Sequence, residues 1–242
     1  MKLLLYEPIN QVQVLMVNTL IQNGVMVFAI TDKYEIISKL HTKQFPVLIC
    51  DASPDDNDII GIVQEIKKDE IIAATKIILH VKNPSKDFLV DMVKIGVSGF
   101  VLKPFVPATF IPKFNDILKK IDPGMTERKH IRVAPDPKDN ASVTLRSAGS
   151  FKLITGRIKD VSMGGVLFQT TTALEENDVV LKQISKSIQI KFRLNTIEVS
   201  AMVIAKQQNM VALKFVTLSD FDKNVLSKYI YEILANDHLS KK

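Results

Sequence analysis

Two kinds of hydrophobic pattern divide the chain, and they constrain its fold more than any other feature. Over residues 1–122, short apolar runs alternate with segments of helical periodicity, whereas residues 136–242 carry short runs rich in β-branched residues in which apolar and polar positions alternate. The first pattern is typical of βαβ units around a parallel sheet, and the second of antiparallel strands. A chain of 242 residues is long enough to give each pattern its own domain and core.

The first half has the strand and helix count of a flavodoxin-like domain. Its predicted strands are residues 3–6, 25–30, 46–51, 76–81 and 99–103, and its predicted helices are 10–24, 32–44, 58–69, 86–96 and 107–121. Gly24 and Gly96 stand where two of these helices should end. Five strands and five helices predict a (βα)5 domain, whose polar site lies beyond the carboxyl ends of the parallel strands.

The ends of three predicted strands resemble those of response-regulator receiver domains. The matching segments are "LLLYEP" (3–8), "VLICDASP" (47–54) and "GVSGFVLKPF" (96–105). The resemblance implies that Asp51 is the phosphoacceptor, that Glu7 and Asp51 are acids at a magnesium site, and that Lys103 pairs with the phosphate. It also implies a cis peptide bond before Pro104.

Several residues depart from the receiver pattern. Pro8 occupies the second place of the acidic pair, His80 or Val81 replaces the expected Ser or Thr, and Pro54 comes one residue early. Because Mg²⁺ requires oxygen ligands in a nearly octahedral array, the loss of one carboxylate weakens that site. Two interpretations follow: a degenerate receiver that serves as a docking or dimerising unit, or a receiver in which Asp51 is phosphorylated.

A turn sequence separates the two halves. Asp122, Pro123 and Gly124 follow a predicted helix end, which predicts a first domain of residues 1–122, a linker of 123–135 and a second domain of 136–242. Strands are predicted at 141–148, 151–162, 164–171, 187–194, 197–207 and 209–218. These strands favour an antiparallel barrel or sandwich, closed by a C-terminal helix with Ser219 as its N-cap.

The first 127 residues contain no arginine, and the next five positions contain two. Arg128 and Arg132 form R-x-x-x-R, and after 27 intervening residues Asp160, Ser162 and Gly165 form D-x-S-x-x-G. These two motifs, in this order and within a β-rich domain, resemble the PilZ domain, the bacterial receptor for cyclic di-GMP. The resemblance covers roughly residues 125–235 and implies a PilZ β-barrel with a C-terminal helix, in which both motifs bind the ligand.

The chemistry of the motif residues fits such a ligand. Guanine presents O6 and N7 as a fork, which a guanidinium group meets with two parallel hydrogen bonds, whereas lysine supplies only a point charge. Asp160 can accept from a guanine N–H, and Ser162 can contact the ligand or hold the turn. Gly164 and Gly165 allow a close approach of the backbone or a positive φ. Asp160 and Ser162 could instead only cap a β-turn.

The remaining basic residues near and beyond the motifs have simpler interpretations. Lys129 and His130 could add positive charge near the ligand phosphates. Arg146, Arg157 and Arg193 are predicted at outward strand positions.

Composition narrows the remaining function classes. Residues 123–242 carry 18 Lys and Arg against 12 Asp and Glu, which accounts for the whole net charge of +6 and assigns any anionic partner to this half. Nucleic acid is a weak candidate, because aromatic residues are not interleaved with the basic ones. Four scattered histidines and the single Cys50 offer no paired nucleophile and base, so we expect no enzyme. No apolar run is long enough for a membrane span, so we expect a cytoplasmic protein.

The leading hypothesis is a cyclic di-GMP receptor in which ligand binding changes the arrangement of the two domains and the binding of a protein partner. The resemblance implies that this partner belongs to motility, adhesion or biofilm machinery. The alternative is a phosphorelay response regulator that uses Asp51, with the barrel as a protein-binding adaptor. Homodimer formation through the last strand and helix of the first domain, 99–103 and 107–121, is a further expectation.

Overall fold

The computed structural model describes residues 1–43, 45–121, 130–147, 149–150 and 152–239, without the side chains of 237–239. The chain separates into two compact units, whose main division in the sequence falls between Glu127 and Arg128. We call them the α/β unit and the barrel unit, and each is described by itself. No helix in the described part of the chain has the length and apolar character needed to cross a membrane.

The α/β unit is built on a parallel sheet of five strands. In the order β2-β1-β3-β4-β5, every neighbouring pair is parallel. The strands are β1 (Lys2–Tyr6), β2 (Met26–Ile30), β3 (Val47–Ala52), β4 (Lys76–Val81) and β5 (Gly99–Leu102). All five predicted strands are confirmed, and the order is that of the flavodoxin-like plan.

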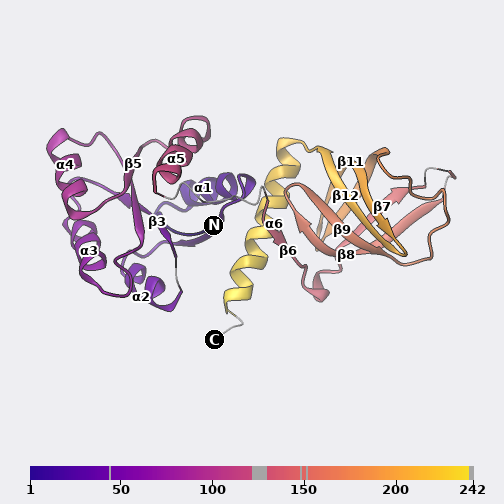
Figure 1. Ribbon diagram of the computed structural model, residues 1–242, viewed down its shortest axis with the longest axis horizontal. Helices are drawn as coiled ribbons and strands as arrows, with labels where there is room; N and C mark the ends of the chain where they lie inside the picture. Colours follow the sequence, from indigo (N-terminus) through magenta and orange to yellow (C-terminus); the bar gives the residue numbers. More distant parts are fainter. Residues whose placement is uncertain (44, 122–129, 148, 151, 240–242) are drawn as a thin grey trace. The chain divides into compact units, whose positions relative to one another are not determined.

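Helices cover both faces of this sheet (Figure 1). Leu4, Leu48 and Leu79 pack with Ile36 and Met92 in one core, which places α2, α3 and α4 on that face, and α1 and α5 lie on the other. Burial on both faces explains why the strands are nearly continuous apolar runs. The helices are α1 (Asn10–Gln22), α2 (Glu35–Thr42), α3 (Asn57–Lys68), α4 (Lys86–Ile95) and α5 (Pro107–Ile121).

Local capping fixes several of these helix ends. The side chain of Asp56 accepts a hydrogen bond from the Ile59 amide at the start of α3, and Ser85 accepts one from Phe88 at the start of α4. Gly96 ends α4 at φ 104°, a left-handed conformation that a residue with a Cβ rarely adopts. The peptide bond between Lys103 and Pro104 is cis, as predicted.

The described residues of the barrel unit form seven strands, six of which close into an antiparallel barrel (Figure 1). The closed order is β8-β7-β10-β11-β12-β9, with β9 returning to β8, and β6 adds to β8. The strands are β6 (Arg132–Val133), β7 (Ser142–Arg146), β8 (Leu153–Ser162), β9 (Gly165–Thr170), β10 (Ile184–Phe192), β11 (Asn195–Gln207) and β12 (Met210–Thr217). The predicted barrel is confirmed, but β6 falls within the segment expected to be a linker.

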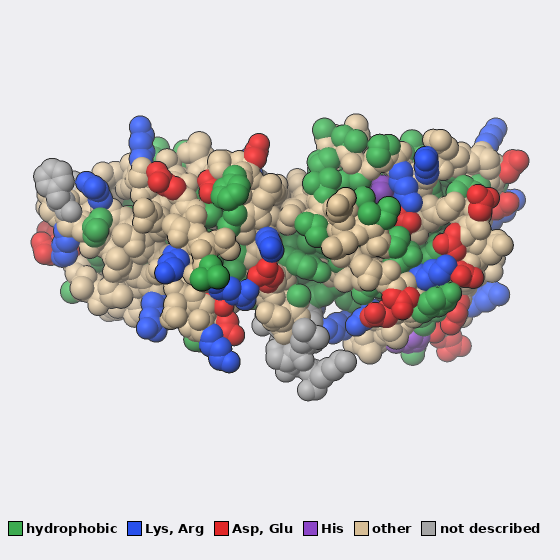
Figure 2. All heavy atoms as spheres, turned by 180° about the vertical axis from the view of Figure 1, so that it is seen from behind, with side chains coloured by type: hydrophobic (Ala, Val, Ile, Leu, Met, Phe, Trp, Pro, Cys, Tyr) green, Lys and Arg blue, Asp and Glu red, His purple; other side chains and the backbone are tan. Residues whose placement is uncertain are grey.

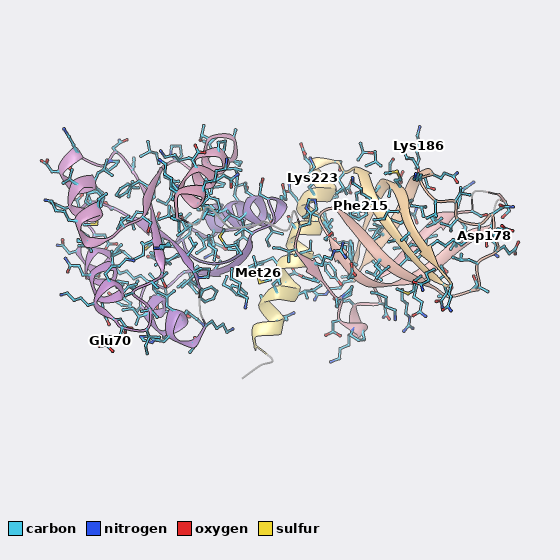
Figure 3. The ribbon with its side chains drawn as sticks, in the orientation of Figure 1. Met26, Glu70, Asp178, Lys186, Phe215 and Lys223 are labelled. Carbon is cyan, nitrogen blue, oxygen red and sulfur yellow. The ribbon has the colours of Figure 1, made fainter. Side chains whose placement is uncertain are left out.

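The loop between β9 and β10 is tied to the barrel by Asp178, which lies at the end of the unit away from the C-terminal helix (Figure 3). The carboxylate of Asp178 is buried, accepts a hydrogen bond from the Ser147 hydroxyl at 3.0 Å, and pairs with Lys152 at 3.4 Å. Hydrogen bonding to the Glu175 amide is the main factor that lowers the pKa of Asp178, so this acid remains charged and holds the loop.

The C-terminal helix α6 (Asp220–Leu239) is attached to the barrel by a polar network. Arg193 donates to Asp139 at 2.7 Å and to Glu232 on α6 at 2.5 Å, and the Tyr229 hydroxyl donates to Asp139 at 2.9 Å. Arg193 was expected at an outward strand position, but it lies in the turn after Phe192, where it links the barrel to the helix. At the helix start, Ser219 accepts from the Asp222 amide, which confirms the predicted N-cap.

We predict that Asp139→Ala lowers the free energy of unfolding of the barrel unit by about 2–3 kcal/mol, because Arg193 and Tyr229 both lose their acceptor. Urea unfolding of the full chain, followed by circular dichroism, measures the change. Glu198→Ala, at an exposed acid on β11, is the matched control. Equal stability of the two variants would show that the network does not hold α6.

Candidate functional site

The long strand β8 shares one of its edges between two partners. Residues 153–157 pair with β7 and residues 161–162 pair with β6, while β9 pairs along the other edge. A register shift between Ile158 and Asp160 inserts Lys159 as an extra residue. Such a β-bulge bends a strand and redirects the side chains beyond it. Ile158 and Val161 both point into the core, and Asp160 between them is left partly exposed.

Strand register brings the residues of the second motif beside β6. Arg132 lies opposite Ser162, and Ser162 lies opposite Gly165. Directly opposed residues share one face of a sheet, and so do residues two apart on one strand, which adds Asp160 to the same face. Their neighbours Val133 and Val161 face the core, so the motif residues lie on the outer face.

Register also adds a cation that the sequence pattern did not reveal. Lys214 on β12 lies opposite Gly165 and is exposed. This places Lys214 in the same cross-strand row as Arg132 and Ser162. Lys214 is about 50 residues from the second motif, and only the pairing of β9 with β12 could have identified it.

Ser162 holds the turn between β8 and β9. Its hydroxyl accepts a hydrogen bond from the Gly164 amide at 3.2 Å and donates one to the Gly165 carbonyl oxygen at 3.3 Å. Met163 and Gly164 form the two-residue turn of this hairpin. Of the two roles expected for Ser162, the structure shows the turn-holding one.

Close approach requires both Gly164 in the turn and Gly165 at the start of β9. A Cβ on Gly165 would collide with the backbone carbonyl oxygen of Leu213, and a Cβ on Gly164 would collide with the ring of His130. Neither glycine has a positive φ. Close approach is therefore the physical reason for both residues, and His130 is packed on the turn that carries the second motif.

The first motif is described only in part. Arg132 is exposed on β6, and the half-buried His130 precedes it by two residues. Arg128 and Lys129 lie outside the described residues. The structure therefore brings Arg132 together with Asp160, Ser162, Gly164 and Gly165, and it does not place Arg128.

A second candidate site lies at the carboxyl ends of the parallel strands. Asp51 is near the end of β3, Glu7 directly follows β1, and Lys103 directly follows β5. The ammonium group of Lys103 forms an ion pair with Asp51 Oδ1, the carboxylate that the resemblance implies as phosphoacceptor. His80 lies opposite Asp51 on β4, with its Nδ1 atom 3.5 Å from Glu7 Oε2 and 3.8 Å from Asp51 Oδ1.

Burial dominates the electrostatics of this second site. Glu7 and His80 are 1% and 2% exposed. Burial raises the pKa of the Asp51 carboxyl, and the neighbouring charge of Glu7 raises it further, while the hydrogen bond from Lys103 opposes both effects. The site contains Glu7 and Asp51 as predicted, but its third potential ligand is an imidazole, which Mg²⁺ does not favour.

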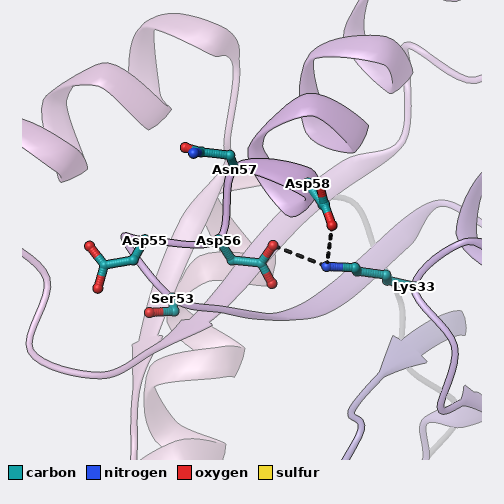
Figure 4. A pocket seen from close by; sticks show the side chains of 6 residues that line it. All are labelled: Lys33, Ser53, Asp55, Asp56, Asn57 and Asp58. Carbon is teal, nitrogen blue, oxygen red and sulfur yellow. Dashed lines mark hydrogen bonds and ion pairs between the residues drawn. The ribbon is translucent and has the colours of Figure 1, made fainter.

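A shallow acidic pocket beside this site was not predicted (Figure 4). It is lined by Lys33, Ser53, Asp55, Asp56, Asn57 and Asp58. Lys33 pairs with Asp56 at 3.2 Å and with Asp58 at 2.8 Å, and hydrogen bonding to Lys33 lowers the pKa of Asp58. Asp56 also caps α3, so the ion pairs of Lys33 stabilise the start of that helix. This structural role accounts for the charged residues that line the pocket.

Comparison with known protein families identifies both units. Residues 126–232 match the family model of the PilZ domain, and residues 4–115 match that of the response regulator receiver domain. The chain combines a receiver domain with a PilZ domain. Both are regulatory families.

Individual relatives each match one of the two domains. The phosphate regulon transcriptional regulatory protein PhoB of Pseudomonas aeruginosa is 23% identical over 39% of this chain, and the match spans 45% of that relative, less than half its length. The chemotaxis protein CheY4 of Vibrio cholerae is 21% identical, with 48% of this chain and 97% of that chain covered and a TM-score of 0.44. The PilZ domain of YcgR from Escherichia coli, solved with c-di-GMP, is 14% identical, with 48% and 97% covered and a TM-score of 0.40.

In the PilZ domain, Gly164 and Gly165 should respond differently to the same added methyl group. We predict that Gly165→Ala lowers the free energy of unfolding by about 2 kcal/mol, because the collision is with the backbone of β12. Gly164→Ala meets only a side chain and should cost less than about 1 kcal/mol. Urea unfolding of both variants measures the difference, and an equal loss would contradict the close approach of β9 to β12.

Proposed function

We propose that this protein is a cyclic di-GMP receptor whose ligand binds on the outer face of the PilZ barrel where β6, β8 and β9 meet. The observation that carries the proposal is the register that aligns Arg132 with Ser162 and Gly165 and places Asp160 on the same face. The YcgR PilZ domain, which was solved with c-di-GMP, supports the choice of ligand.

The chemistry of each group suits a part of this ligand. Arg132 and Arg128, which is four residues earlier in the sequence, would form paired hydrogen bonds with guanine O6 and N7 or with the phosphates. Asp160 would accept from a guanine N–H. Lys159 on the bulge and Lys214 in the same cross-strand row are exposed and add positive charge, which attracts a ligand with two phosphates.

His130 gives the first motif a fixed point on the barrel. Its ring lies on Gly164, so the residue two positions before Arg132 contacts the turn of the second motif. We propose that this contact lowers the entropic cost of ligand binding, because it restricts the backbone next to Arg132 before the ligand binds.

Binding at this segment would act on the connection between the domains. Arg128 directly follows the division of the two units at Glu127, so a ligand held by Arg128 would restrict that connection. The ligand can shift the arrangement of the domains only through a higher affinity for one arrangement than for the others. We propose that this shift changes the binding of a cytoplasmic protein partner in motility, adhesion or biofilm machinery, and that the protein has no catalytic role.

Calorimetric titration of cyclic di-GMP into the full chain tests the receptor function. We expect binding that neither GTP nor cyclic di-AMP reproduces. Arg132→Ala should weaken it about 10- to 100-fold, since hydrogen bonds to a charged group contribute roughly 1.5–3 kcal/mol, and the Arg128→Ala, Arg132→Ala variant should abolish it. Arg157→Ala removes an exposed arginine from the same strand as Asp160 and is the matched control.

Two outcomes would overturn the proposal. One is the absence of cyclic di-GMP binding by the intact protein, and the other is equal affinity of the double arginine variant and the Arg157→Ala control. Binding to nucleic acid with a steep salt dependence and no nucleotide selectivity would instead favour a nucleic-acid function. On the face shown in Figure 2, basic side chains are interspersed with acidic ones, which does not favour that function.

A phosphorelay function has one observation in its favour, the ion pair between Lys103 and Asp51. If it operates, a small phosphodonor such as acetyl phosphate with Mg²⁺ should phosphorylate the full chain, and Asp51→Asn should abolish the reaction. Asp55→Asn, at an exposed acid in the following loop, is the control. Because Pro8 stands in place of the second acid of a magnesium site, we expect little phosphorylation. Measurement of the intact protein mass shows whether a phosphoryl group has been added.

A further inference from the structure

Three potential metal ligands from three strands converge in the receiver domain. Glu7 follows β1, Asp51 is on β3 and His80 is on β4, and one ligand atom from each lies within 4.8 Å of the others. These strands are neighbours in the sheet, so their backbone hydrogen bonds fix the spacing of the three side chains. The site is thus preorganised before any ion binds.

The environment of His80 points to a ligand. His80 is 2% exposed, and within the described part of the chain neither ring nitrogen has a hydrogen-bond partner. Its ring meets the rings of Phe105 and Phe110 edge to face, with centroids 6.3 and 6.5 Å away, so apolar surface surrounds it on that side. Buried polar groups without partners are costly, and a metal ion at Nδ1 would remove that cost.

We propose that Glu7, Asp51 and His80 bind a first-row transition-metal dication, for which Zn²⁺ is the probe, in preference to Mg²⁺. Mg²⁺ requires six oxygen ligands in nearly octahedral geometry, whereas Zn²⁺ accepts imidazole and carboxylate ligands together. Pro8 supplies no carboxylate where receiver domains have a second acid, and His80 supplies a nitrogen. The donor set therefore differs from a magnesium site in both respects.

The spacing of the donor atoms agrees with this choice of ion. Two ligand atoms about 2.1 Å from a tetrahedral Zn²⁺ lie roughly 3.4 Å apart. His80 Nδ1 is 3.5 Å from Glu7 Oε2 and 3.8 Å from Asp51 Oδ1. The Glu7 and Asp51 oxygen atoms lie within 4.8 Å of each other, so closing of the two carboxylates around the ion would complete the protein ligands, and water would fill the remaining position.

Lys103 competes with the metal for Asp51. Its ammonium group pairs with the oxygen atom of Asp51 that faces His80. Metal binding must weaken this ion pair, because both cations use the same carboxylate. Removing Lys103 should therefore strengthen metal binding, which is the opposite of what loss of a structural residue does.

Calorimetric titration of ZnCl₂ into the metal-free full chain tests the proposal. We expect one site that His80→Gln weakens at least 100-fold, and MgCl₂ should bind at least 100-fold more weakly than Zn²⁺ to the unaltered protein. The matched control is His41→Gln, because His41 also pairs with a carboxylate, Asp69 at 2.9 Å, but lies at the surface with a single acid. This variant should retain the site.

Two further measurements guard against an unfolded variant. Circular dichroism establishes that His80→Gln keeps its helical content, and Lys103→Met should bind Zn²⁺ more tightly than the unaltered protein. Co²⁺ in place of Zn²⁺ should give a visible absorption spectrum that is lost in His80→Gln and kept in His41→Gln. Zn²⁺ binding that survives His80→Gln, equal affinity for Mg²⁺ and Zn²⁺, or no binding by the intact protein would each overturn the proposal.

Discussion

The pairing of β8 with three other strands is the constraint on which the PilZ domain depends. The first half of β8 pairs with β7, and the end of β8 pairs with β6 at the same edge. The other edge of β8 pairs with β9. The extra residue Lys159 lies between the segments that pair with β7 and β6, and such a β-bulge bends the strand. The same bulge turns Asp160 outward, so the bend of β8 and the orientation of this motif residue have one physical origin.

Both candidate sites use the backbone of a sheet to fix polar side chains. In the receiver domain, parallel strands end together, so Glu7, Asp51 and His80 meet although 72 residues lie between the first and the last. In the PilZ domain, antiparallel register aligns Arg132 with Ser162. Sheets are suitable supports because their hydrogen bonds resist the small displacements that would separate such groups.

Much of this organisation could be predicted from the sequence. The strands and helices of the receiver domain follow from hydrophobic periodicity, and the barrel from alternation between turns, since both patterns record local burial. The motifs indicated Arg132, Asp160, Ser162, Gly164 and Gly165, because each needs a particular residue type for its chemistry or its space.

Features that depend on register could not be predicted. Strand β6 is two residues long and carries no alternation, so it was assigned to the linker. Lys214 and the contact of His130 with Gly164 depend on which strands become neighbours, and Arg193 depends on where a turn falls. The sequence marked His80 only as a departure from the receiver pattern. Its position beside Asp51 depends on the pairing of β4 with β3, which the sequence does not show.

The central claim is that cyclic di-GMP binds on the outer face where β6, β8 and β9 meet. Mapping of backbone amide chemical shifts by NMR during titration of the full chain with cyclic di-GMP tests it most directly. We predict that the largest changes fall in residues 128–133 and 159–165. Changes of equal size throughout the chain, or a largest cluster around Asp51, would contradict the claim.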